Sequence, residues 1–389
     1  MLRGNFQPRS LNQSLRILLI TGLAVAGWSL ASWYQQIISM LPPVLSLFRE
    51  DLDFQVYFSN LGWIRHGVAL YDHGYAEYPV LGLMYVNWPH YVTQSFESFH
   101  WLLWFSNAGL LLLSVWLWRE IAELIGLSKG GWWLWLLPSS LYYSLNRFDI
   151  FPVCLVLISL YLLLHKYVRS AWVVYGLAIM AKTYPLFLLP LYLQLSREQK
   201  TSWHVFLPYL LAPILGLLFG AWSVGGWAAV VVPYTLQLAR GVGLGSLRAL
   251  AEQFGAAGSL WPAVAQLGQI IVPAWWFCRA VANKSPLTTR GLLALAAITL
   301  LLLTNLYPFY SNQWWLWVLP FVVWVLPPPY RWQVAAYDLV NYVQFPIAFQ
   351  LWGQSSSLFS FVVAIRGALV LWLVVLLWQQ LPRRWWSLV

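Results

Sequence analysis

The stretch "ILLITGLAVAGWSLASWY", Ile17–Tyr34, is an almost unbroken apolar run, long enough for a helix to cross a membrane. It follows a basic leader with Arg3, Arg9 and Arg16. Its length favours an uncleaved signal-anchor over a signal peptide, whose apolar part is shorter.

Hydrophobic residues make up 60% of the 389-residue chain and charged residues only 9%. Such a chain cannot expose most of its surface to water, so we expect a polytopic membrane protein.

Similar apolar runs recur as far as residue 380 and leave no room for a soluble domain. They predict an all-α, single transmembrane domain over residues 1–389, with about twelve membrane helices and a range of about 10 to 13. The approximate spans are 17–40, 100–120, 130–146, 150–165, 170–184, 185–196, 204–224, 258–278, 291–306, 314–328, 333–352 and 358–380.

The distribution of charge predicts an orientation. With a cytoplasmic N-terminus, most basic residues fall in cytoplasmic breaks and most acidic residues on the opposite side, as the positive-inside rule requires. The net charge of +10 therefore indicates loop bias and acidic lipid head groups, and no nucleic acid is expected as a partner. We expect a multi-pass protein of the plasma membrane, with both termini cytoplasmic and its chemistry extracytoplasmic. The cations outside this pattern are Arg49, Arg65, Arg147, Lys182, Arg240, Arg248 and Arg366.

Two extracytoplasmic loops are expected, at residues 42–98 and 225–257. In the first, apolar residues from Phe54 to Ile64 recur at helical spacing and predict an amphipathic helix in the membrane interface. The following "YDHGYAEYPVLGLMYVNWPHYV", residues 71–92, predicts turns and then a helix too short to cross. The glycines of "ARGVGLGSLRALAEQFG", residues 239–255, suggest a mobile connection in the second loop.

The first loop begins with a cluster of carboxylates, "REDLDFQVYFSN", Arg49–Asn60. Sugar transfer from a lipid-phosphate donor needs a carboxylate that accepts the proton of the acceptor hydroxyl, and cations that hold the leaving phosphate. Asp51 and Asp53 are candidates for the base. A solvated loop, with local pairing to Arg49, is the alternative interpretation.

Candidate cations lie at two outer junctions between spans. "SLNRFDIFP" places Arg147 and Asp149 at one junction, and "MAKTYPLFLLP" places Lys182 at another. They suit phosphate binding, but Arg147 could instead pair with Asp149 while Lys182 reaches the interface. A third junction, "NLYPFYSNQWWLWVLP", offers uncharged polar groups beside tryptophans, which suit sugar hydroxyls and ring stacking: Asn305, Tyr307, Tyr310, Asn312 and Gln313.

Three further groups of residues bear on metal binding or ion pairing. The histidines of the first loop, His66, His73, His90 and His100, match no metal-ligand spacing. Asp51 and Asp53 form an Asp-x-Asp pair that could hold a divalent cation, the one cofactor left open. Asp338 and Arg366, each inside an expected span, predict a structural ion pair or the flanks of a cavity.

Several motifs together resemble the GT-C superfamily of membrane glycosyltransferases, and glycosyltransferase family 87 in particular. "DFQVYFSNLGWIRHGVALYDHGYAEYPVL" resembles the first-loop pattern of that family, although Val80 stands where a second proline is usual. "NRFDIFP", "AKTYPLFLLP" and "YSNQWWLWVLP" resemble its later hairpins. "DLDFQVY" also resembles the mannosyltransferase that adds the first mannose to glycosylphosphatidylinositol.

The resemblance implies an inverting transfer of a sugar, commonly mannose, from a polyprenyl-phosphate donor to a lipid-linked or glycan acceptor on the outer face. It implies that Asp53 is the base, with Asp51 supporting it or exchanging that role. Arg147 and Lys182 are expected to hold the lipid phosphate. Secondary phosphate candidates are Arg65, Arg240 and Arg248. Sugar and acceptor candidates are Tyr57, Glu77, Tyr78, Asp149, Tyr184 and Gln313. The alternatives are a lipid or oligosaccharide transporter and a catalytically inactive scaffold of the same fold.

Overall fold

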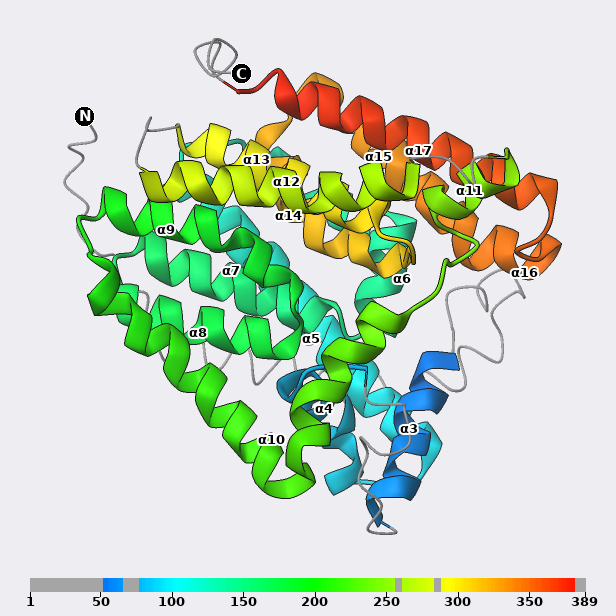
Figure 1. Cartoon of the computed structure of the whole chain (residues 1–389), viewed down its shortest axis with the longest axis horizontal. Coiled ribbons are helices and arrows are strands. Elements are labelled where there is room, and N and C mark those ends of the chain that lie inside the picture. The colour runs from blue at the N-terminus through cyan, green and yellow to red at the C-terminus, as the bar shows by residue number, and fades with distance from the viewer. Residues whose placement is uncertain (1–51, 66–76, 256–260, 283–287, 382–389) are drawn as a thin grey trace.

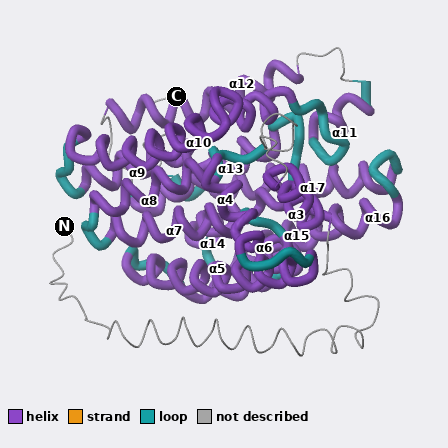
Figure 2. The backbone as a smooth tube through the Cα atoms, turned by 90° about the horizontal axis from the view of Figure 1, so that it is seen from below, coloured by secondary structure: helices purple, strands orange, loops and turns teal. Residues whose placement is uncertain are grey.

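The computed structural model describes residues 52–65, 77–255, 261–282 and 288–381, and within these ranges all regular secondary structure is helical (Figure 2). The α-helices are α3 (Leu52–Arg65), α4 (Val80–Asn87), α5 (Phe96–Leu124), α6 (Pro138–Asn146), α7 (Ile150–Leu164), α8 (Val168–Ala181), α9 (Leu189–Glu198), α10 (Trp203–Ala239), α11 (Leu247–Gln253), α12 (Trp261–Ala282), α13 (Thr289–Leu306), α14 (Trp315–Val325), α15 (Arg331–Tyr342), α16 (Phe349–Trp352) and α17 (Ser357–Trp378). Short helical turns lie at Trp88–Tyr91, Lys129–Leu136, Tyr184–Leu188, Asn312–Trp314, Pro328–Tyr330 and Val343–Ala348.

Among the described residues, four helices are long and apolar enough to cross a membrane: Phe96–Leu124, Trp203–Gln237, Thr289–Leu306 and Ser357–Trp378. Helices α6 and α7 meet at an angle of 100°, and a fifth crossing results if the two count as one broken span. The expected all-helical membrane protein is confirmed. The count of twelve spans is not confirmed, because several of the expected spans are short helices here and the first lies outside the described residues.

Much of the predicted second loop, residues 225–257, is helical in the structure. Helix α10 turns at Gly226, whose φ of 62° and ψ of −157° lie in a region that only glycine adopts readily, and then continues to Ala239. α11 occupies Leu247–Gln253, and the non-helical residues 240–246 connect it to α10. Gly241, Gly243 and Gly245, three of the glycines that suggest a mobile connection, fall in this segment.

Helix α3 forms as predicted, but its apolar stripe faces protein. Phe54 and Tyr57 are buried and form a small core with Val86, Phe99 and Phe148, from α4, α5 and the junction before α7. These two residues of the apolar stripe therefore contact protein, and the expected position of the helix in the membrane interface stays a prediction. Packing against three other elements holds the first turn of α3, with Asp53, close to the α6–α7 break.

Helices α7, α8 and α9 lie side by side and α10 packs along α8 (Figure 1). Because α7 begins at Ile150 and α8 ends at Ala181, Asp149 and Lys182 meet at neighbouring helix ends. A large apolar core joins these helices to α13 and α14. The bundle therefore brings together side chains that are more than thirty residues apart in the sequence.

The expected ion pair between Asp338 and Arg366 is wrong, since each side chain has other partners. The Asp338 carboxylate accepts hydrogen bonds from the amides of Ser139 and Ser140 at the start of α6, and from the Trp315 indole. Arg366 donates to the Gly245 carbonyl and lies over the Tyr310 ring. A helix N-terminus thus supplies the positive partner of the buried carboxylate.

Close packing at Gly82 predicts a loss of stability in Gly82→Ala. A Cβ there would overlap the Ala181 carbonyl oxygen and approach the Phe148 ring to 3.3 Å. We expect a loss of about 1–3 kcal/mol, typical of an overpacked core, measured by unfolding in detergent. Gly109→Ala is the matched control, because a Cβ there meets no atom within 4 Å. Equal stability of the two variants would contradict the described packing of α4 on α8.

Candidate active site

The site is built around the break between α6 and α7. Helix α6 ends at Asn146, Arg147 is extended with φ −133° and ψ 153°, and α7 begins at Ile150. Arg147, Phe148 and Asp149 are therefore presented from irregular backbone inside the bundle. In a membrane protein, non-helical backbone at depth is found where it is buried in protein or lines a cavity.

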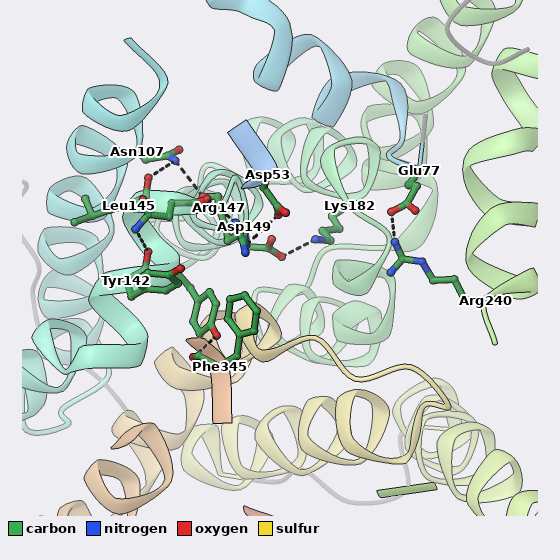
Figure 3. Close-up of polar contacts among 12 residues, drawn as sticks. Asp53, Glu77, Asn107, Tyr142, Leu145, Arg147, Asp149, Lys182, Arg240 and Phe345 are labelled. Carbon is green, nitrogen blue, oxygen red and sulfur yellow. Dashed lines mark hydrogen bonds and ion pairs between the residues drawn. The ribbon is translucent and has the colours of Figure 1, made fainter. Parts of the chain in front are cut away.

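The structure pairs the two cations of the predicted hairpins with carboxylates from elsewhere (Figure 3). The Nε of Arg147 lies 3.0 Å from Oδ2 of Asp53, and Nζ of Lys182 lies 2.6 Å from Oδ1 of Asp149. The alternative of local pairing between Arg147 and Asp149 is therefore wrong. The Arg147 side chain is 6% exposed and that of Asp53 is 29% exposed, so the carboxylate is the accessible member of this pair.

Lys182 lies among aromatic rings. Its Nζ is 4.4 Å from the ring centroid of Phe148, 5.1 Å from that of Trp317 and 5.5 Å from that of Tyr78. The Trp317 indole N–H donates to the same Asp149 oxygen, at 2.7 Å. Asp149 and the ring faces together stabilise the ammonium and fix its position.

A cavity of about 380 Å³ lies against Lys182. Its lining includes Arg240, so two cations face one space. The other lining residues are Glu77, Tyr78, Pro79, Thr183, Tyr184, Leu186, Phe187, Pro233, Tyr234, Gln237, Leu303, Thr304, Tyr307, Gln313, Trp314 and Trp317. This combination of a few polar groups with a mostly apolar wall is typical of a small-molecule site.

Opposite Lys182, the second arm of α10 is tied to the segment before α4. Arg240 forms an ion pair with Glu77 and lies 4.5 Å over the Phe309 ring. Gln237 donates to the Glu77 carbonyl at 3.1 Å, and the Tyr307 hydroxyl donates to the Gln237 carbonyl. Glu77 therefore lines the cavity as a carboxylate paired with arginine, a second candidate base beside Asp53.

One wall of the cavity is a stack of aromatic rings. Tyr184 and Trp317 stack with centroids 4.4 Å apart and planes within 6°, and Trp314 stacks on Trp317 at 5.2 Å. Gln313, largely buried, lies at the same wall. Flat rings beside an amide group are suited to the apolar face and the hydroxyls of a hexose.

The tyrosines near Asp53 retain their protons. Burial raises the pKa of the Tyr78 hydroxyl well above its usual value, and the nearby carboxylates of Asp53 and Glu77 raise it further. Burial, with Tyr78 and Asp53, likewise raises the pKa of Tyr57. Both groups are therefore hydrogen-bond donors at neutral pH, not bases. Tyr57 is 1% exposed, belongs to the small core around α3 and is not among the residues that line the cavity.

The structure brings most, but not all, of the predicted residues together. Lys182, Glu77, Tyr78, Tyr184, Gln313 and Arg240 line the cavity. Asp53 and Arg147 pair with each other and are not among the residues that line it. Asp149 lies behind Lys182 as its partner and is fully buried, so it supports the lysine instead of contacting sugar. Arg248 pairs with Glu252 within α11, at 2.9 Å, and is not among the residues that line the cavity. Asp51 and the side chain of Arg65 lie outside what the structure describes.

Three polar residues predicted at the third junction serve packing. Asn312 and the Tyr310 hydroxyl both contact Asn341, and Asn305 donates to the Leu301 carbonyl. Of that group, Tyr307 and Gln313 reach the cavity. Of the four first-loop histidines, the two that the structure describes, His90 and His100, pack against aromatic rings. No group of three His, Cys, Asp or Glu residues with metal-binding geometry occurs within the described ranges, and Asp51 lies beyond them.

Sequence reasoning missed Trp317, Gln237 and Asn107. Trp317 lies one helical turn after Gln313 and Trp314, so helical spacing was the available signal. Gln237 lay in a segment interpreted as a loop. Asn107 is a fully buried amide inside the apolar helix α5, and an intramembrane polar residue is a signal of function or packing that could have been used.

A family model described as mannosyltransferase (PIG-M) matches residues 144–235. The matched segment contains Arg147, Asp149 and Lys182 and runs into α10, but it covers less than half of the chain. A comparison with curated proteins finds no match. The resemblance to glycosyltransferase family 87 stays a prediction. The family match and the long apolar helices support the predicted class of protein, a membrane mannosyltransferase enzyme.

Proposed function

We propose that the protein transfers mannose from a polyprenyl-phosphate donor to a lipid-linked or glycan acceptor on the extracytoplasmic face, with inversion at the anomeric carbon. The family match supports mannosyl transfer, and the charge distribution of the chain supports the outer face. The observation that carries the proposal is the cavity lined by Lys182, Arg240 and stacked aromatic rings, together with the Asp53–Arg147 pair, which lies near the lining residue Tyr78.

In this proposal the phosphate of the donor binds Lys182 and Arg147. A guanidinium carries five N–H donors, so Arg147 can contact both Asp53 and a phosphate oxygen. The sugar lies along the wall formed by Tyr184 and Trp317, with Gln313 and the protonated Tyr78 hydroxyl donating to its oxygens. Arg240 and Glu77 lie at the opposite side of the cavity.

The proposed reaction is a single displacement. Asp53 accepts the proton of the acceptor hydroxyl as the acceptor oxygen forms a bond to the anomeric carbon. The bond between that carbon and the phosphate oxygen breaks, and its electron pair stays on the phosphate. The phosphate gains negative charge in this step, so Lys182 and Arg147 stabilise the transition state more than the bound donor. One base on the face opposite the phosphate accounts for inversion without a covalent enzyme intermediate.

The rival class is a transporter that moves a lipid or oligosaccharide without chemistry. Its charges would be expected along span interiors on both sides of the membrane. The described ion pairs near the cavity, Asp53–Arg147, Asp149–Lys182 and Glu77–Arg240, gather instead at one region of the bundle (Figure 3). An inactive scaffold would keep this geometry without turnover.

A reconstitution experiment distinguishes these functions. Proteoliposomes would receive polyprenyl-phosphate mannose with a radiolabelled sugar, and membranes from cells that lack the protein as the source of acceptor. We expect label in a glycan or glycolipid, release of polyprenyl phosphate, and an inverted anomeric configuration by NMR. A nucleoside-diphosphate mannose in place of the lipid donor should give no labelling. Movement of intact donor between leaflets without transfer would indicate a transporter, and neither transfer nor movement would indicate a scaffold.

A further inference from the structure

The break between α6 and α7 leaves backbone carbonyl groups that need partners. At the end of a helix the last carbonyls lose their intrahelical hydrogen bonds, and in a membrane no water replaces them. Here the carbonyls of Leu145 and Arg147 both point to the side chain of one residue of α5, Asn107 (Figure 3).

Asn107 is fully buried and satisfies both groups. Its Nδ2 donates to the Leu145 carbonyl at 3.0 Å and to the Arg147 carbonyl at 3.1 Å, which uses both hydrogens of the amide. Its Oδ1 accepts the hydroxyl hydrogen of Tyr85 at 2.6 Å. Because the two carbonyls accept and the tyrosine donates, only one orientation of the amide fits all three bonds.

Tyr85 extends the contact to α4 and α7. Its ring stacks on Phe151, in the first turn of α7, with centroids 4.2 Å apart and planes within 9°. The hydroxyl and the ring therefore hold both sides of the break: the carbonyls before it through Asn107, and the helix after it through Phe151.

The three residues between α6 and α7 each contact the site. Arg147 reaches Asp53, Phe148 lies under the Lys182 ammonium, and Asp149 binds Lys182. A rotation of the Arg147 peptide would displace all of them together. The Asn107 amide binds the backbone carbonyl of Arg147, the residue whose side chain reaches Asp53.

We propose that Asn107, oriented by the Tyr85 hydroxyl, is a positioning residue that holds the helix break so that Arg147 stays at Asp53 and at the donor phosphate. This inference rests on the proposed function, which gives Arg147 its role in phosphate binding. Neither residue falls in the segment matched by the family model, and neither touches the cavity.

The test compares Tyr85→Phe and Asn107→Leu in proteoliposomes with polyprenyl-phosphate mannose, at fixed membrane acceptor. Tyr85→Phe removes the hydroxyl that orients Asn107 and should raise the apparent KM for the donor about ten-fold. That factor corresponds to the free energy of one hydrogen bond to a buried group. Loss of the amide should lower kcat/KM about 100-fold, typical of a misplaced binding group, with the acceptor KM within about three-fold of wild type. A purely structural role would lower the amount of active protein and leave the donor KM unchanged, which would overturn the proposal.

Tyr192→Phe is the matched control, because its buried hydroxyl also binds a backbone carbonyl, that of Val156, but away from the cavity. The donor KM of this variant should equal that of wild type. A double-mutant cycle then asks whether Asn107 acts through Arg147: on an Arg147→Ala background, Tyr85→Phe or Asn107→Leu should add less than about three-fold. The full single-mutant loss on that background would overturn the proposal. If Asn107→Leu does not fold, the Tyr85→Phe cycle carries the test.

The two hypotheses fail in different ways. Unchanged donor KM and kcat in Arg147→Ala alone would refute the phosphate role of Arg147 in the proposed function. A clear loss in Arg147→Ala, with wild-type kinetics in both Tyr85→Phe and Asn107→Leu, would refute the positioning role and leave the proposed function standing.

Discussion

Asp53→Asn should lower kcat about 1,000-fold, within the range that a general base contributes. The amide keeps the shape of the carboxylate but cannot accept the proton of the acceptor hydroxyl. It also withdraws the anionic partner of Arg147, 3.0 Å away, so folded protein must be measured alongside turnover. Initial rates with polyprenyl-phosphate mannose, per mole of folded protein, give the result.

Two further substitutions make the Asp53 result specific. Glu252→Gln is the matched control: Glu252 is also a carboxylate paired with an arginine, but its partner is Arg248 within α11 and not Arg147 at the helix break, so turnover should be unchanged. Glu77→Gln tests the rival base, which lines the cavity beside Arg240. We expect a loss of no more than about ten-fold there, from altered binding alone. A larger loss in Glu77→Gln than in Asp53→Asn would transfer the role of base to Glu77.

Lys182→Met should lower kcat/KM by about 100- to 1,000-fold, because it removes a cation from the position of the developing phosphate charge. It should also destabilise the protein by about 3–5 kcal/mol, since Asp149 would remain as a buried carboxylate without its cation. Melting in detergent and initial rates would be measured on the same preparations.

The double variant Lys182→Met with Asp149→Asn separates these two effects. Removing the orphaned charge should restore much of the stability but none of the activity. Lys129→Met is the control for the loss of a lysine: Lys129 pairs with Glu123 at an exposed position and should be dispensable. Recovery of turnover in the double variant would show that the lysine serves only to neutralise Asp149.

The sequence predicts the class of fold and six of the eighteen residues that line the cavity, but not the pairing of the charged residues. Apolar runs identify a helical membrane protein, and helical spacing identifies α3, because both depend on local periodicity. Arg147 binds Asp53 instead of Asp149 two residues away, since the extended backbone at the break and the packing of α3 decide which carboxylate is in reach. Such a contact depends on the tertiary arrangement, which spacing along the chain does not contain.

The errors have similar physical causes. Residues 227–239 fall within the expected second loop, yet they form a second helical arm that follows the non-helical turn at Gly226. Asp338 and Arg366 were expected to pair because each is a costly intramembrane charge, but the amides that begin α6 and the Tyr310 ring satisfy them separately. Backbone dipoles and ring faces act as partners in the folded protein, and no count of charges in the sequence includes them.

A structure of the Asp53→Asn variant with bound polyprenyl-phosphate mannose tests the central claim most directly. The account predicts the phosphate within about 3 Å of the side-chain nitrogens of Arg147 and Lys182, the length of a charge-assisted hydrogen bond. It predicts the mannose along Tyr184 and Trp317, with residue 53 facing the anomeric carbon opposite the phosphate. A phosphate bound away from both cations, or Glu77 in place of residue 53 across the anomeric carbon, would contradict it.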